Sequence, residues 1–111
     1  MKYKLGVDAE DIRHQIWFAI GFAEALSEAL GYGEVVVTSL RDGTHSAKSL
    51  HYEGLAMDLR TRNLTAEQIC GWVSLLKKYL DPRGFDVVLE EDHIHVEFQP
   101  KPGEHFDERV I

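Results

Sequence analysis

The chain has one cysteine, three prolines and no long apolar run in its 111 residues. A single cysteine cannot form an intramolecular disulfide, so no disulfide framework holds this fold. No apolar run approaches the ~20 residues that a membrane-spanning helix needs, so we expect no membrane partner. The length supports one compact domain over residues 1–111.

Basic residues are also scarce, because 12 Lys and Arg stand against 19 Asp and Glu, for a formal net charge of −7. Phosphate binding needs a basic field, which argues against a nucleic-acid partner. Lys2 and Lys4 are followed by no apolar stretch, so the N-terminus does not have the pattern of a signal peptide. We expect synthesis in the cytosol, and action on an extracellular target would need a separate release step.

Two segments have the apolar periodicity of amphipathic helices. The first is Asp11–Leu30, which Gly31 ends. The second is Thr65–Leu80, where Thr65 and Gln68 have the spacing of a capping box. Acidic residues before and at the start of the first helix favour its positive end, namely Asp8, Glu10 and Asp11.

The remaining apolar segments predict strands at Val35–Leu40, from Leu55 onward, at Phe85–Glu90 and at His93–Phe98. The last two alternate apolar and polar residues, and a two-residue loop between them would make a hairpin. In that register one face is wholly apolar, with the pairs Leu89–Ile94, Val87–Val96 and Phe85–Phe98. We therefore predict a small α+β domain with a mostly antiparallel sheet and two helices packed on one face.

Histidines and carboxylates are concentrated in two short segments that contain three of the six histidines. His51 and Asp58 are seven residues apart, a spacing that suits a loop entering a strand better than adjacent helical turns. In that strand Asp58 points away from the core face, and His93 and His95 share one face of a later strand. Imidazole nitrogen and carboxylate oxygen are good zinc ligands, so the polar faces of the two strands could meet around one ion.

The sequence Ser-x-His-x-x-Gly-x-Ala-x-Asp runs without a mismatch from Ser49 to Asp58, and a His-x-His follows it. This pattern resembles the zinc peptidase family of D-Ala-D-Ala carboxypeptidases, D-Ala-D-Ala dipeptidases and phage L-Ala-D-Glu endopeptidases, whose fold the Hedgehog signalling domain shares. The resemblance implies a Hedgehog-type fold and a Zn2+ cofactor. It implies zinc ligands at His51, Asp58 and His95, and substrate binding by Arg41 and Ser49.

Two acidic residues compete for the role of general base, which takes a proton from the attacking water. Family members place an acid three residues before the last ligand, which is Asp92 here. The hairpin register instead puts Glu90 on the face of His93 and His95. His93 resembles the first histidine of the family's His-x-His, and it would stabilise the oxyanion of the tetrahedral intermediate.

The leading hypothesis is a zinc metallopeptidase that hydrolyses peptidoglycan stem peptides, such as a phage lysis enzyme. The bond cut, D-Ala-D-Ala or L-Ala-D-Glu, stays open. The alternative is a zinc-stabilised binding or structural module of the same fold without turnover, because the chain is short and has few loops to shape a substrate cleft.

Overall fold

The structure is a computed structural model that describes residues 1–42, 51 and 54–99. None of the helices in these ranges has the length and hydrophobicity of a membrane span. The elements are β1 (Lys2–Tyr3), α1 (His14–Leu30), β2 (Val36–Ser39), β3 (Ala56–Arg60), α2 (Ala66–Leu80), a 3-10 turn (Asp81–Arg83), β4 (Phe85–Leu89) and β5 (His93–Phe98).

The described strands form one five-stranded mixed sheet in the order β1-β2-β3-β5-β4. β1 pairs with β2 in parallel, and the other three pairings are antiparallel. The predicted α+β class with a mostly antiparallel sheet is therefore confirmed. β1 was not predicted, because its two exposed residues are too few to show an alternating pattern.

The β4–β5 hairpin has the predicted register. Phe85 pairs with Phe98, Val87 with Val96 and Leu89 with Ile94. The backbone N–H of Glu90 donates to the carbonyl of His93, which closes the hairpin around the two-residue loop. The polar residues of β5 therefore all point to the face opposite the apolar pairs.

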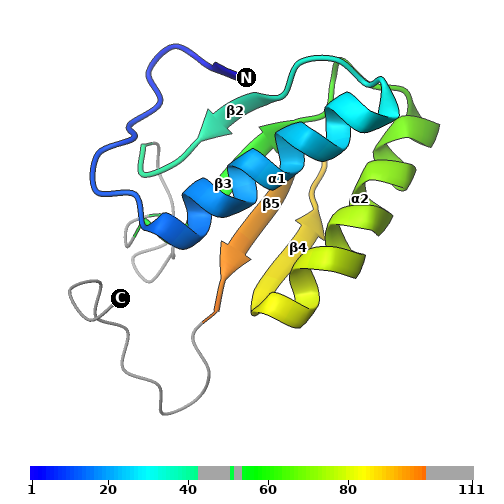
Figure 1. The fold of residues 1–111 in the computed structure, drawn as a ribbon. Helices are drawn as coiled ribbons and strands as arrows, with labels where there is room; N and C mark the ends of the chain where they lie inside the picture. The colour runs from blue at the N-terminus through cyan, green and yellow to red at the C-terminus, as the bar shows by residue number, and fades with distance from the viewer. Residues whose placement is uncertain (43–50, 52–53, 100–111) are drawn as a thin grey trace.

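Both helices cover the same face of the sheet (Figure 1). α2 begins with the predicted capping box, in which the Thr65 hydroxyl accepts from the Gln68 N–H and the Gln68 side chain accepts from the Thr65 N–H. One core joins the helices to the sheet, and its fully buried members include Ile16, Ile20, Val37, Met57, Leu59, Trp72, Leu76, Ile94 and Val96. The opposite face of the sheet is left for polar side chains.

α1 begins at His14 and not at Asp11, so that boundary was wrong. Asp11 has a positive φ of 55°, which a helix does not accommodate, and the N–H of Arg13 donates to the carbonyl of Gly54 instead. The first turn of α1 has no acidic residue, because Asp8, Glu10 and Asp11 all precede it. Gly31 ends the helix in the left-handed conformation, as predicted.

Gly54 lies where the segment before α1 crosses the chain entering β3. Its φ of +72° is in the left-handed region, and a Cβ at this position would overlap the carbonyl oxygen of Asp11. Only glycine satisfies both conditions. The glycine of the Gly-x-Ala-x-Asp motif thus allows the N-terminal segment to lie directly against the motif backbone.

We predict that Gly54→Ala lowers the free energy of unfolding by at least about 2 kcal/mol, since it combines left-handed strain with a backbone clash. Gly21→Ala is the matched control, because that helical glycine has open space around its Cα. Urea denaturation of both variants checks this. Equal stability of the two variants would contradict the tight crossing at Gly54.

Candidate metal centre

β3 and β5 place an aspartate beside a histidine on the polar face of the sheet. Their antiparallel register pairs Asp58 with His95 and Arg60 with His93. Asp58 lies between Met57 and Leu59, which are both fully buried in the core, so its own side chain points to the other face. Asp58 is buried and His95 is partly buried on that face.

His51 reaches the same place from the chain that precedes β3. Its side chain is 2% exposed, and its Nδ1 is hydrogen-bonded to the carbonyl oxygen of Leu40. The turn after Leu40 is itself fixed, because an Asp42 carboxylate oxygen accepts from the backbone N–H groups of Leu40 and Asp8. The N-terminal segment thereby supports the imidazole of His51 through the Leu40 turn.

Three potential ligand atoms converge at this point. His51 Nε2 lies 3.3 Å from Asp58 Oδ1 and 3.2 Å from His95 Nδ1, and His95 Nδ1 lies 2.9 Å from Asp58 Oδ1. Tetrahedral zinc with bonds of about 2.0–2.1 Å separates its ligand atoms by about 3.3 Å. The group His51, Asp58 and His95 could therefore hold a metal ion with little movement.

Each imidazole also has a hydrogen bond on the side that faces away from Asp58. These two bonds indicate which ring nitrogen carries the proton in the neutral form. His51 Nδ1–H donates to the Leu40 carbonyl, and His95 Nε2–H donates to Glu97 Oε1 over 2.8 Å. With those tautomers, the neutral forms of both rings would turn lone pairs toward the Asp58 carboxylate. Three acceptors this close repel one another unless a cation or a proton lies between them, which is the environment of a metal site.

The close contact between Asp58 and the histidines shifts the pKa values of both Asp58 and His95. The hydrogen bond to Asp58 raises the pKa of His95 to about 8, although burial acts in the opposite direction. Burial favours a high pKa for the Asp58 carboxyl, but the hydrogen bonds and charges of the surrounding histidines outweigh it and hold that pKa well below its ordinary value. In the absence of a metal, a proton on His95 compensates the carboxylate.

The structure places two of the three predicted catalytic residues next to the centre. His93 Nε2 lies 3.7 Å from Asp58 Oδ1, and His93 Nδ1 lies 2.6 Å from Asp92 Oδ1. This hydrogen bond lowers the pKa of Asp92. Glu90 is exposed, and its backbone N–H donates to the carbonyl of His93, but within the described part of the chain its side chain has no hydrogen bond to the histidines.

Of the two predicted substrate-binding residues, Arg41 is held by the N-terminal segment. Its Nη1 donates to Asp11 Oδ2 and to the Glu10 carbonyl, both over 3.3 Å. Its role in substrate binding stays a prediction. Ser49 lies outside the described residues.

Glu97 is the residue of this site that sequence reasoning missed. Its Oε1 accepts from His95, and its Oε2 accepts from the side-chain amide of Gln99 over 2.7 Å. A carboxylate hydrogen-bonded to the far nitrogen of a ligating histidine fixes the ring and raises its basicity. The alternation His93, His95, Glu97 along β5 was the available signal, because it puts all three on one face.

Comparison with models of protein families finds no match, and comparison with curated proteins finds no related sequence. The assignment of the centre therefore depends on its motif and geometry.

We predict that Glu97→Ala weakens zinc binding by about 10- to 100-fold, because His95 loses the partner that orients it. Asp86→Ala is the matched control, since Asp86 is exposed and pairs with Glu97 across the hairpin. Competition with a chromogenic chelator measures the affinity. Equal loss in both variants would show that charge alone, and not orientation of His95, sets the affinity.

Zinc affinity should rise with pH up to about 8 and then level off, because the ion must displace the proton that His95 holds below its pKa of about 8. The rise for this one proton is about tenfold per pH unit below the pKa. Chelator competition between pH 6.5 and 9 measures it. An affinity that does not change over the lower part of this range would contradict protonation of His95.

Proposed function

We propose that the chain is a zinc peptidase of the D-Ala-D-Ala carboxypeptidase and L-Ala-D-Glu endopeptidase type, with the Hedgehog-type fold, acting on peptidoglycan stem peptides. The observation that carries this proposal is the convergence of His51 Nε2, Asp58 Oδ1 and His95 Nδ1 within 2.9–3.3 Å of one another. Three protein ligands is the number that a catalytic zinc takes, whereas structural zinc takes four.

The chemistry of the donors favours zinc over other common ions. Calcium and magnesium prefer all-oxygen surroundings, whereas two imidazoles and one carboxylate suit zinc. Zinc bound there would polarise the scissile carbonyl and lower the pKa of water.

Asp92 is the proposed general base. Its lowered pKa keeps the carboxylate ionised at neutral pH, and a substrate that covers it would remove water and raise that pKa again. Water adds to the carbonyl carbon and gives its proton to Asp92. The C–N bond then breaks, and Asp92 returns the proton to the leaving amine.

His93 is the proposed stabiliser of the tetrahedral intermediate. Asp92 holds its Nδ1 at 2.6 Å, while its Nε2 faces the centre at 3.7 Å from Asp58 Oδ1. If the ring carries a proton on both nitrogens, Nδ1–H donates to Asp92 and Nε2–H would donate to the oxygen that becomes negative in the transition state. Asp92 and His93 also line one pocket, and Glu90 is not among the residues that line it. This placement supports Asp92 over Glu90 as the base.

We predict that Asp92→Asn lowers kcat on a stem peptide by about 10²- to 10⁴-fold while the zinc content is retained, because the proton acceptor is lost. Glu90→Gln removes a charge two residues away and should leave kcat close to that of the wild type. Mass spectrometry of wall fragments gives the rate and the bond cleaved. Inactivation by Glu90→Gln and not by Asp92→Asn would reverse the assignment.

A second candidate function is a zinc-stabilised module without turnover. It is favoured by the proximity of His93 Nε2 to Asp58, since a small rotation would make His93 a fourth ligand. Its Nδ1 already has the carboxylate partner that ligating histidines require. Four protein ligands would close the site and leave no position for substrate. The number of imidazoles on bound zinc therefore separates the two candidates.

A further inference from the structure

The outer face of α1 is largely apolar, although it is exposed to solvent. At 3.6 residues per turn, the exposed residues of this helix fall within an arc of about 120°. Trp17 is 41% exposed and Phe18 is 48% exposed. The whole set, which contains no lysine or arginine, is His14, Trp17, Phe18, Gly21, Ala25, Glu28 and Ala29.

α1 is therefore apolar on both of its sides. Its inner side is buried in the core through Ile16, Ala19, Ile20 and Ala23. α2 covers the same face of the sheet, but its exposed residues include Glu67, Lys77 and Lys78, as is usual for a helix with solvent on its outer side. A helix that is apolar all round is typical of an interior, so α1 has the composition of a helix that is packed on both sides.

The outer face of α1 has a shape that complements a second copy of itself. The bulky side chains Trp17 and Phe18 lie before Gly21, and the small side chains Ala25 and Ala29 lie after it. A two-fold axis beside Gly21 makes two α1 helices antiparallel, so that residues equally far before and after Gly21 become level with one another. Trp17 of one copy is then level with Ala25 of the second copy.

The polar residues at the two ends of this face are complementary as well. His14 in the first turn and Glu28 in the last turn are equally far from Gly21, so they become level in both halves of the antiparallel pair. An imidazole N–H can donate to a carboxylate. Within the described part of the chain Glu28 has no ion pair, whereas Glu24 is paired with the N-terminal amine over 3.5 Å.

Charge favours a protein partner for this face over a lipid surface. Helices that lie on membranes carry lysine and arginine on their polar side, but the 17 residues of α1 contain neither. The net charge of −7 would also repel an anionic bilayer. Gly21 has open space around its Cα, which allows the axis of a second helix to approach closely.

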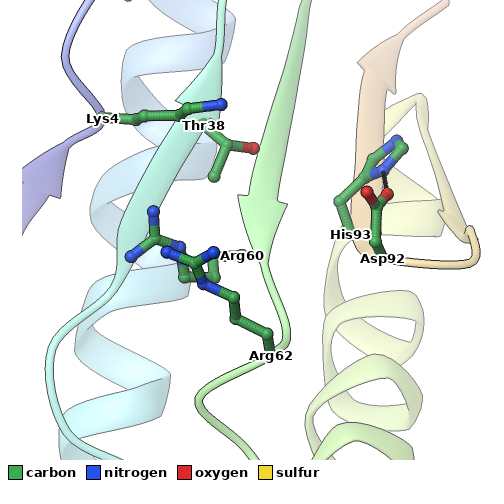
Figure 2. Close-up of a pocket in the computed structure, with 6 residues that line it drawn as sticks. All are labelled: Lys4, Thr38, Arg60, Arg62, Asp92 and His93. Atoms are coloured by element: carbon green, nitrogen blue, oxygen red, sulfur yellow. Dashed lines mark hydrogen bonds and ion pairs between the residues drawn. The ribbon is translucent and has the colours of Figure 1, made fainter.

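We propose that the outer face of α1 binds a second copy of the chain, with the two α1 helices antiparallel about a two-fold axis beside Gly21. The inference does not depend on the proposed peptidase function. Both metal centres stay accessible in the pair, because they lie on the other face of the sheet. Figure 2 shows side chains of the pocket beside the centre on the near side of the strands and the helices on the far side. That pocket is lined by Lys4, Thr38, Arg60, Arg62, Asp92 and His93.

Sedimentation equilibrium of the full chain, with and without zinc, measures the association. We expect a monomer–dimer equilibrium with a dissociation constant of about 1–100 µM, because one pair of helices is smaller than a standard interface. Trp17→Ala should weaken the association at least about tenfold, since each half of the pair loses a tryptophan contact. Leu5→Ala is the matched control, because it removes a 98% exposed apolar side chain outside α1 and should change nothing.

A charge reversal tests the antiparallel arrangement. His14→Glu places a carboxylate level with Glu28 of the second copy and should weaken the association about threefold or more. Addition of Glu28→Lys makes the two levels oppositely charged and should restore the association. An acid in the first turn and a base in the last turn both suit the helix dipole, so these variants should fold, which circular dichroism checks.

A wild type that stays monomeric up to about 500 µM would overturn the proposal. Association that requires zinc, or that Trp17→Ala leaves unchanged, would overturn it too, because another surface would then be responsible. A double variant as weak as His14→Glu would refute the antiparallel pairing. Vesicles of phosphatidylglycerol and phosphatidylcholine are assayed in parallel, and binding of a monomeric wild type to them through Trp17 would assign the face to lipid instead.

Discussion

The convergence of two imidazole nitrogens on one carboxylate oxygen is the constraint around which the polar face of this sheet is organised. His51 Nε2, Asp58 Oδ1 and His95 Nδ1 lie within 2.9–3.3 Å of one another, and the Leu40 carbonyl and Glu97 fix the rings in that orientation. Packing of Met57 and Leu59 on the helix side holds β3 in register, so Asp58 cannot turn away. The core stabilises an arrangement that becomes favourable when a cation occupies it.

Residues outside the ligand set also hold the metal centre in place. Gly54 lets the N-terminal segment approach the chain that carries His51, and Asp42 fixes the Leu40 turn that holds the ring. β1 brings Lys4 to the edge of the polar face. The short N-terminal segment therefore contributes both to the stability of the metal centre and to the charge of the adjoining pocket.

The parts of the fold with a strong local pattern could be predicted from sequence. The capping box at Thr65 and the hairpin register follow from side-chain chemistry within a few residues, and both are confirmed. The start of α1 could not be predicted, because a contact with Gly54, far along the chain, holds the backbone around Asp11 out of the helix. The motif pointed to His51, Asp58 and His95, and the alternation along β5 was enough to place Glu97 on the face of His95. The position of Lys4 beside that face could not be predicted, because the two residues of β1 show no pattern in the sequence.

The number and kind of ligands on bound zinc decide whether this centre is an open metal site. X-ray absorption of the zinc-loaded chain, combined with elemental analysis, measures both. We expect one zinc per chain with two imidazoles and further light-atom oxygen ligands. Absence of zinc under zinc-replete conditions would contradict the metal centre, and a third imidazole would contradict the open site that a peptidase needs.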